Sequence, residues 1–166
     1  KRDDRFVTGG TYHARVWQLD YARKKFHVID VKMGSVRRFI QCIAISSCDH
    51  YAYVGTETGD LMKLKIDRDE MRSYNDPDTI IPSLCGASKD RLSQGICVVR
   101  CFTHSSGKEH ILCGGGDGTI CYMNSLLKVD KERKNSLLGG CTGVTVHPKT
   151  GVIMAGTDQS NRYAVS

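Results

Sequence analysis

Four residues of the kinds that bind zinc lie within a short stretch of this sequence: Cys97, Cys101, His104 and Cys113. Zinc ligands converge on one point at about 2.0 to 2.3 Å, and the chain contains no Cys-x2-Cys pair to begin such a site. On one extended strand the first two cysteines would stand roughly 13 Å apart. We therefore expect no metal site and no cofactor, and we interpret the eight cysteines as mostly buried free thiols of a reducing compartment.

Two glycine-rich segments could be mistaken for phosphate-binding loops, Gly-Thr-Glu-Thr-Gly-Asp at 55–60 and Gly-Gly-Gly-Asp-Gly-Thr at 114–119. A phosphate-binding loop requires a lysine and a following helix whose amide end faces the anion, and neither segment has them. Both segments run into apolar strands instead. We interpret them as tight turns between strands.

Nucleophilic catalysis is disfavoured because the chain has six histidines but no Gly-x-Ser-x-Gly elbow. His104 and His110 flank a Ser-Ser-Gly-Lys-Glu loop and His147 precedes Pro148, so these histidines are expected at loop rims. Arg100 stands in an otherwise apolar strand, where a buried unpaired charge would be costly. It either lines a central channel or meets an acid. The sequence predicts no catalytic residue and no enzyme activity.

The glycine turns recur, and their repetition predicts the fold class. Four times a short apolar strand runs through glycine into a tight turn and a second strand, beginning at 6–10, 53–56, 112–115 and 154–157. The first glycines of the copies are 46, 59 and 42 residues apart, which brackets the roughly 40 to 45 residues of a four-stranded WD-repeat blade. Glycine is expected in these links because it adopts positive φ readily.

Further strands complete each unit. The segments 39–45 and 96–102 are almost continuously apolar, as expected of inner strands buried on both faces. The stretch 24–31 alternates in polarity, which is typical of an outer, half-solvated strand. Residues 79–81 before Pro82 form a second candidate outer strand, because proline is tolerated at a sheet edge. They lie in the long connection between 67 and 94, which explains the interval of 59 residues and is either functional or floppy.

These elements predict an all-β chain that forms part of a WD-repeat β-propeller, with about three to four blades of antiparallel four-stranded sheets. We expect a blade without its inner strand at about 1–35, complete blades at about 36–94 and 95–138, and a blade without its outer strand at about 139–166. At each end of the segment, the sheet face that a further blade would cover is left exposed, which forgoes roughly 6 to 12 kcal/mol of stabilisation from apolar burial. The segment is therefore expected to belong to a longer chain, or to self-associate when isolated.

Composition limits the classes of partner. The chain has 166 residues, 40% of them hydrophobic and 25% charged, and it begins Lys-Arg-Asp-Asp-Arg, which cannot start a signal peptide. Because no stretch approaches the roughly 18 apolar residues of a membrane span, we expect neither secretion nor membrane insertion. The net charge of +6 could face an acidic polymer, although the Lys and Arg runs could equally be solvated loop residues. Only 7% of residues are aromatic, with none among the basic runs, which disfavours nucleic-acid stacking.

The chain resembles the WD-repeat cilia- and flagella-associated proteins of the axonemal doublet lumen. The likeness extends along nearly the whole sequence and is weakest at 67–88 and 124–138. Two features distinguish this family from WD-repeat proteins in general: the Gly-Thr-x-Thr-Gly-Asp turn at 55–60 and the Ser-x-Gly sequence at 93–95 before Arg100-Cys101. The stretches that carry the likeness are 7–10, 14–19, 54–63, 89–95, 99–101 and 155–158.

The resemblance implies two seven-bladed propellers, with this chain in the later half of the first. It also implies a non-enzymatic protein of the cytoplasm and cytoskeleton, in the axoneme of the cilium or flagellum, that binds tubulin and neighbouring proteins and stabilises the doublet. The chain departs from the general WD pattern, because its single Trp is Trp17 and no Gly-His pair precedes the inner strands. We therefore expect the polar network of typical WD repeats to be mostly absent.

A protein–protein interaction scaffold of another intracellular WD-repeat family is the alternative function. In either case partner contacts are expected at exposed basic turns and around the long connection. The candidate residues are Arg23, Lys24, Lys25, Arg72, Tyr74, Lys131, Arg133 and Lys134.

Overall fold

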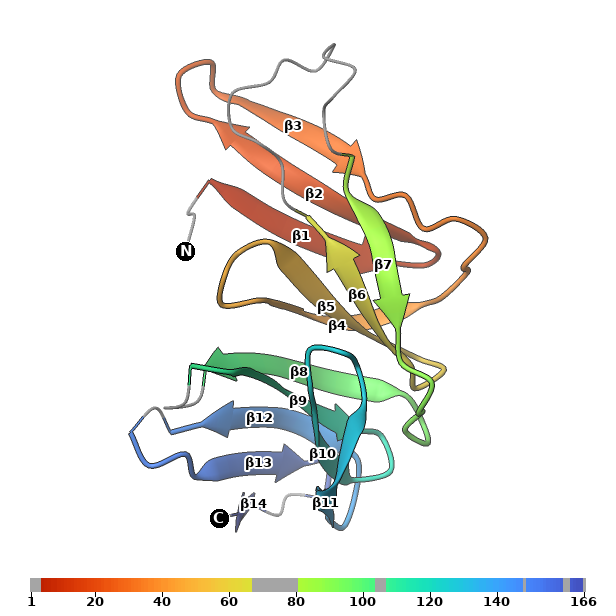
Figure 1. Cartoon of the computed structure of the whole chain (residues 1–166), viewed down its shortest axis with the longest axis vertical. Helices are drawn as coiled ribbons and strands as arrows, with labels where there is room; N and C mark the ends of the chain where they lie inside the picture. The colour runs from red at the N-terminus through yellow and green to blue at the C-terminus, as the bar shows by residue number, and fades with distance from the viewer. Residues whose placement is uncertain (1–3, 67–80, 104–106, 148, 160–161, 166) are drawn as a thin grey trace.

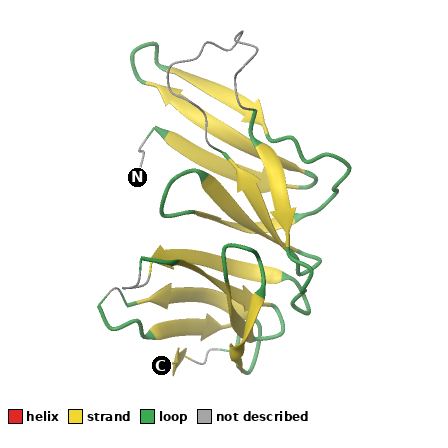
Figure 2. Cartoon of the chain, viewed as in Figure 1, coloured by secondary structure: helices red, strands yellow, loops and turns green. Residues whose placement is uncertain are grey.

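The structure of the chain is a computed structural model that describes residues 4–66, 81–103, 107–147 and 149–159, and the backbone of 162–165. The regular structure of these residues consists of β-strands (Figure 2), and they include no helix long and apolar enough to cross a membrane. The strands form four antiparallel sheets that follow one another in chain order (Figure 1). The prediction of an all-β fold is confirmed.

Within each sheet, strands that are consecutive in sequence are hydrogen-bonded neighbours. The first sheet contains β1 (Arg5–Gly10), β2 (His13–Asp20) and β3 (Lys25–Asp30). The second contains β4 (Ile40–Ile45), β5 (Tyr51–Thr56), β6 (Leu61–Lys65) and β7 (Ser83–Ala87).

The third sheet contains β8 (Ile96–Thr103), β9 (Glu109–Gly115), β10 (Thr119–Met123) and β11 (Val129–Ser136). The fourth contains β12 (Cys141–Val146), β13 (Ile153–Thr157) and β14 (Arg162–Val165). Two sheets of four strands are thus flanked by two sheets of three among the described residues. The division into blades at about 1–35, 36–94, 95–138 and 139–166 stays a prediction.

The apolar core consists of three layers, one between each pair of successive sheets. The middle strands serve two layers at once. In β5, Val54 faces the first layer and Tyr53 the second, while in β9, Cys113 faces the second layer and Leu112 the third. Because side chains alternate between the faces of a strand, such strands must be apolar on both faces.

The repeated glycines lie inside strands, at the contacts between sheets. Gly55 in β5 and Gly114 in β9 do not have positive φ. A Cβ on Gly55 would come within 2.6 Å of both Cys42 Sγ and Ile96 Cγ2, and one on Gly114 within 2.5 Å of Cys141 Sγ. The prediction that these glycines serve the turns is therefore wrong. They allow the first strand of the following sheet to approach closely.

Positive φ occurs a few residues later, in the turns themselves. Gly59 in the β5–β6 turn has φ +83° and Gly118 in the β9–β10 turn has φ +81°. In the second turn the Gly118 amide donates to the Gly115 carbonyl at 3.1 Å, and Asp117 Oδ1 accepts from the Thr119 amide at 2.9 Å. The interpretation of these two glycine-rich segments as tight turns is confirmed.

A β-bulge recurs near the start of β4, β8 and β12. In each case one extra residue separates two successive pairs of the ladder, and these residues are Gln41, Cys97 and Thr142. Since bulges bend a strand and increase its twist, the three inner strands share one local shape. The repeated register indicates that the sheets are copies of one structural unit.

Two expectations about strands are corrected. The inner strands β4 and β8 are only half-buried, because each is the edge strand of its sheet. On β8, Arg100 is exposed and donates Nε to the Val144 carbonyl of β12 at 3.3 Å. The outer strand, expected at 79–81, is instead β7, which begins after Pro82. The Pro82 carbonyl accepts a hydrogen bond from the Lys32 amide at 2.8 Å. Residues 79 and 80 lie outside the described residues.

Candidate functional site

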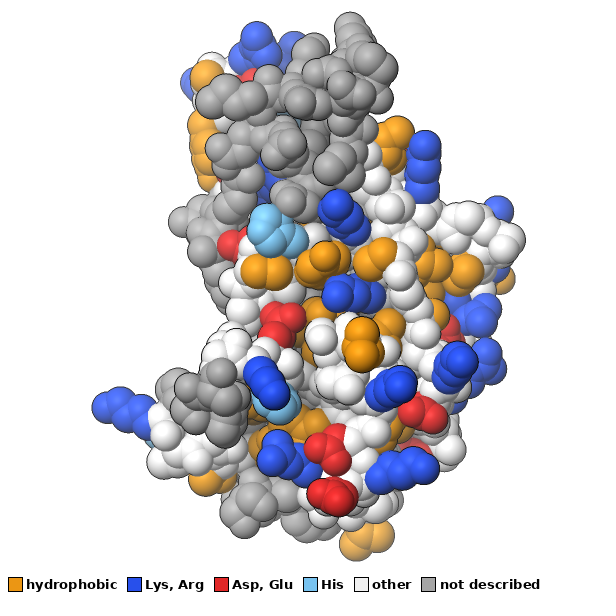
Figure 3. All heavy atoms as spheres, in the orientation of Figure 1, with side chains coloured by type: hydrophobic (Ala, Val, Ile, Leu, Met, Phe, Trp, Pro, Cys, Tyr) orange, Lys and Arg blue, Asp and Glu red, His pale blue; other side chains and the backbone are white. Residues whose placement is uncertain are grey.

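The sequence-predicted contact residues do not form a single site. Arg23, Lys24 and Lys25 are exposed at the β2–β3 turn, near the upper end of the view in Figure 1, whereas β11 lies near the lower end. On the face drawn in Figure 3, Lys and Arg side chains are interspersed with Asp and Glu, so positive charge is not gathered in one uniform patch. Arg72 and Tyr74 lie outside the described residues.

The remaining predicted residues lie on β11, where two of them border a hollow. This hollow, which we call the basic pocket, has a volume of about 380 Å³ and separates β11 from the connection between β7 and β8. Three cationic side chains and one carboxylate line it together with two apolar side chains: Asp90, Arg91, Leu92, Val129, Lys131 and Lys134.

The stretch of β11 that contains Lys131 is irregular, whereas Lys134 lies just beyond it in the regular ladder. The pairing of β10 with β11 moves from Cys121↔Lys134 to Met123↔Val129, so residues 130–133 lie opposite a single residue of β10. Such bulges redirect side chains away from the ladder.

Arg133, the third predicted residue of this strand, takes a different place. Its guanidinium lies 5.7 Å from the centre of the Tyr122 ring and 3.8 Å from the Asp130 carboxylate. The structure therefore separates Arg133 from Lys131 and Lys134, which line the pocket.

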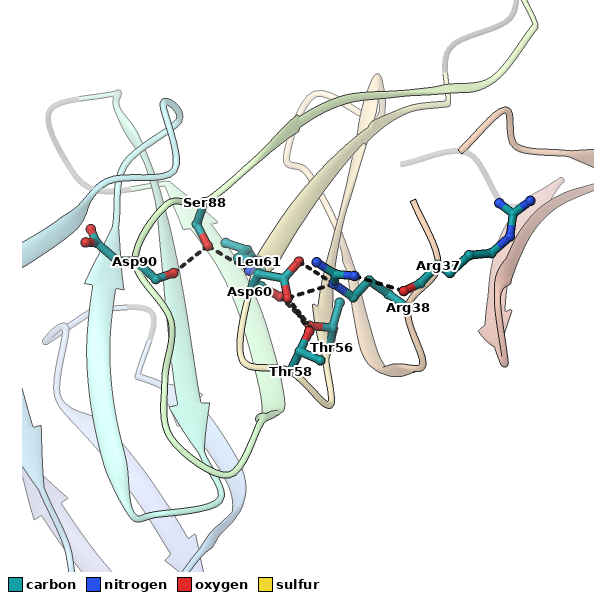
Figure 4. A network of polar contacts seen from close by, with 8 residues as sticks. All are labelled: Arg37, Arg38, Thr56, Thr58, Asp60, Leu61, Ser88 and Asp90. Carbon is teal, nitrogen blue, oxygen red and sulfur yellow. Dashed lines mark hydrogen bonds and ion pairs between the residues drawn. The ribbon is translucent and has the colours of Figure 1, made fainter. Parts of the chain in front are cut away.

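The opposite wall of the pocket is fixed to the second sheet. The Ser88 amide donates to the Leu61 carbonyl at 2.7 Å, and the Ser88 hydroxyl accepts from the Leu61 amide at 2.9 Å. The same hydroxyl donates to the Asp90 carbonyl at 2.7 Å (Figure 4). Further along, the Leu92 amide donates to the Gly59 carbonyl at 3.0 Å.

The β5–β6 turn that holds this wall is organised around one carboxylate. Asp60 is the only charged residue that is buried among those the structure describes. It accepts hydrogen bonds from the hydroxyls of Thr58 and Thr56, the latter at 2.9 Å. Arg38, from the connection between the first two sheets, donates Nε to both carboxylate oxygens at 3.2 Å (Figure 4). This turn therefore has a polar network that is built from other residues than those of the general WD pattern.

Burial alone would raise the pKa of Asp60, but hydrogen bonds from Thr58 and Thr56 and the nearby charge of Arg38 outweigh it. The pKa of the carboxyl is therefore held below its usual value. The turn therefore stabilises the ionised carboxylate of Asp60.

We expect this carboxylate to make the fold sensitive to acid. A carboxyl group with a lowered pKa in the folded chain stabilises the fold fully above its unfolded pKa of about 3.9, and this contribution is lost as the pH falls through the folded pKa. Urea denaturation below about pH 4 should therefore show a larger loss of stability for the wild type than for Asp60→Asn, measured from neutral pH. Parallel losses in the two proteins would contradict the assignment.

These features define a class of protein. The chain has the fold of a WD-repeat β-propeller, of which it forms four successive sheets. It superposes on the crystal structure of the WD40 β-propeller domain of Doa1 with a TM-score of 0.69, over 99% of this chain and 48% of that chain. The two sequences are 10% identical, so this likeness concerns the fold alone. No family model matches the chain.

In sequence the chain is similar to proteins named Cilia- and flagella-associated protein 52. It is 29% identical over 165 residues to those of Bos taurus and Homo sapiens, and 22% identical over 160 residues to that of Chlamydomonas reinhardtii. The alignments cover 99%, 99% and 96% of this chain but 24% of each relative. The chain thus spans about a quarter of these relatives' length. The resemblance predicted from its motifs is confirmed.

Proposed function

We propose that this chain is part of a non-enzymatic scaffold of cilia and flagella, which binds tubulin and neighbouring proteins inside axonemal doublet microtubules. The observation that carries the proposal is the similarity along 99% of the chain to relatives whose name associates them with cilia and flagella. The similarity extends to Chlamydomonas reinhardtii over 96% of the chain. The propeller fold supports it, because repeated sheets present many turns and outer strands to partners.

Two cysteines of the core are poorly suited to nucleophilic catalysis. Burial raises the pKa of Cys42 to about 12 and that of Cys121 to about 11. Because the thiolate is the reactive form, these thiols are poor nucleophiles at neutral pH. Both lie in core layers between sheets, where they pack as small apolar side chains.

Two separate basic surfaces are proposed to make the partner contacts. One is the β2–β3 turn with Arg23, Lys24 and Lys25, and the other is the pocket side of β11 with Lys131 and Lys134. Arg133 is proposed beside the second surface, and Arg72 and Tyr74 remain candidates in the long connection. Because the two surfaces lie toward opposite ends of the molecule, one chain can bridge two partners.

Association with axonemes tests the proposal. The tagged chain is mixed with detergent-extracted axonemes, recovered, and analysed for the proteins that elute with it. Co-elution of tubulin is expected. Recovery of a purely cytosolic set of partners would instead favour the scaffold of another WD-repeat family.

Reversal of charge at the β2–β3 turn is expected to weaken binding to tubulin without changing stability. The double substitution Lys24→Glu and Lys25→Glu should lower the affinity for tubulin. The decrease should be only about tenfold, because each exposed ion pair contributes little to the binding free energy. A matched control reverses the exposed Lys108 and Lys149. Affinity is measured by sedimentation with microtubules, and the thermal unfolding midpoint by circular dichroism. A joint fall of affinity and midpoint would show that the turn is structural.

A further inference from the structure

We propose that the basic pocket is a docking site for an acidic protein segment that carries an apolar side chain. This inference rests on the proposed scaffold function and adds the chemistry of one partner. Its first support is charge. Arg91, Lys131 and Lys134 surround the hollow with a single acid, Asp90, whose Oδ2 already accepts from the Val129 amide at 3.4 Å.

The second support is the apolar lining of the same hollow. Leu92 is 5% exposed and belongs to the core layer between the second and third sheets, and Val129 packs against that layer. Both also line the pocket, so an inserted apolar side chain would extend an existing core. A volume of about 380 Å³ suits one or two side chains of a docked segment. The stems of the two lysines can cover such a side chain while their ammonium groups meet carboxylates.

The third support is the fixed geometry of both walls. The connection wall is held to the second sheet by the paired hydrogen bonds of Ser88 with Leu61 and by the Leu92 amide. On the other wall, the bulged segment of β11 is closed by a hydrogen bond from the Glu132 amide to Asp130 Oδ1 at 3.1 Å. A site whose backbone is already ordered loses less entropy when a segment binds.

The lining favours an acidic peptide over a nucleic acid. Proteins that bind single strands combine cations with aromatic side chains on which bases stack. The six lining residues include no aromatic side chain. Arg133 covers the neighbouring Tyr122 ring, which further separates that ring from a docked base.

A binding measurement with a defined probe tests the inference. The probe is a short fluorescent glutamate-rich peptide with one leucine, titrated with the full chain and followed by anisotropy. The test variant carries Lys131→Gln and Lys134→Gln. The control variant carries Lys108→Gln and Lys149→Gln, which remove the same charge from exposed positions outside the pocket. Two further probes are the peptide with serine in place of leucine and a single-stranded oligonucleotide.

Saturable binding of the leucine peptide is expected, with an affinity that falls about tenfold in the pocket variant and remains unchanged in the control variant. The serine peptide should bind several-fold more weakly, a result that does not depend on any protein substitution. Absence of binding, equal losses in both variants, or equal binding of both peptides would overturn the proposal. So would tighter binding of the oligonucleotide than of the leucine peptide.

The same measurement separates this inference from the proposed function. Peptide binding at the pocket without recovery of tubulin from axonemes would contradict the ciliary role and leave the pocket assignment intact. Recovery of tubulin that persists unchanged in the pocket variant, together with failure of peptide binding, would contradict the pocket assignment and leave the ciliary role intact.

Discussion

Gly55→Ala is expected to destabilise the fold by about 1 to 3 kcal/mol or more, because the new methyl group would overpack a closed contact. Its Cβ would stand 2.6 Å from Ile96 Cγ2 and 2.8 Å from Ile96 Cβ, and the Ile96 side chain is fully buried. Cys42 Sγ would also lie at 2.6 Å, so relief would require both the Cys42 and the Ile96 side chains to move. The second and third sheets would have to separate.

Gly156→Ala is the matched control for this substitution. Gly156 occupies the equivalent place in β13, paired with Gly143 as Gly55 is paired with Cys42. Among the described residues, a Cβ there would meet only Thr142 Oγ1, at an ordinary 3.4 Å. We expect the free energy of unfolding to change by about 0.5 kcal/mol or less. Urea denaturation of both variants measures the difference, and equal losses would refute the role assigned to the repeated glycines.

The contrast between these glycines shows which parts of the fold can be predicted from sequence. Strand pairs and their turns follow from local patterns, so the four repeated units were predicted correctly. The contact of Gly55 with Ile96 joins residues that are distant in sequence, and no local sequence pattern predicts it. The same reason explains β7: its sequence, Ser-Leu-Cys-Gly-Ala, is weak in β-propensity, but pairing with β6 on one side and a bridge from Lys32 on the other hold it extended.

The candidate site was predicted only in part for a similar reason. The basic run of β11 indicated Lys131 and Lys134, but Arg91 and Asp90 come from a separate connection and join them only in the folded chain. Arg38 belongs to an Arg-Arg pair that is typical of a solvated surface. The sequence did contain a signal for the role of Asp60, because an aspartate that ends a turn containing two threonines has hydroxyl donors within reach.

Asp60→Ala is expected to destabilise the chain by about 2 to 4 kcal/mol at neutral pH, since it removes the acceptor of several partly or fully buried donors. The Thr56 hydroxyl is buried. Of its two hydrogen bonds to residue 60, only the one to the backbone carbonyl would remain. Arg38, whose side chain is 28% exposed, can turn toward water, which moderates the loss.

Asp30→Ala supplies the control with the same chemistry at the surface. Arg15 donates Nε to Asp30 Oδ1 at 2.8 Å, a shorter contact than that of Arg38, but the two side chains are 44% and 75% exposed. Water and salt screen such a pair, so its removal should change stability by about 0 to 1 kcal/mol. Urea denaturation of both variants at neutral pH compares the two ion pairs directly. If the shorter exposed pair proved the more important one, burial would not be the source of the stabilisation.

The loss of Asp60 should also reach the basic pocket. The turn that Asp60 organises presents the Gly59 carbonyl to the Leu92 amide and the Leu61 backbone to Ser88, and both contacts position the connection wall. Asp60→Ala should therefore weaken binding of the acidic peptide even under conditions in which the variant remains folded, whereas Asp30→Ala should not. Unchanged peptide affinity in a folded but destabilised Asp60→Ala protein would show that the wall is held without the turn, because stability and pocket geometry would then be independent.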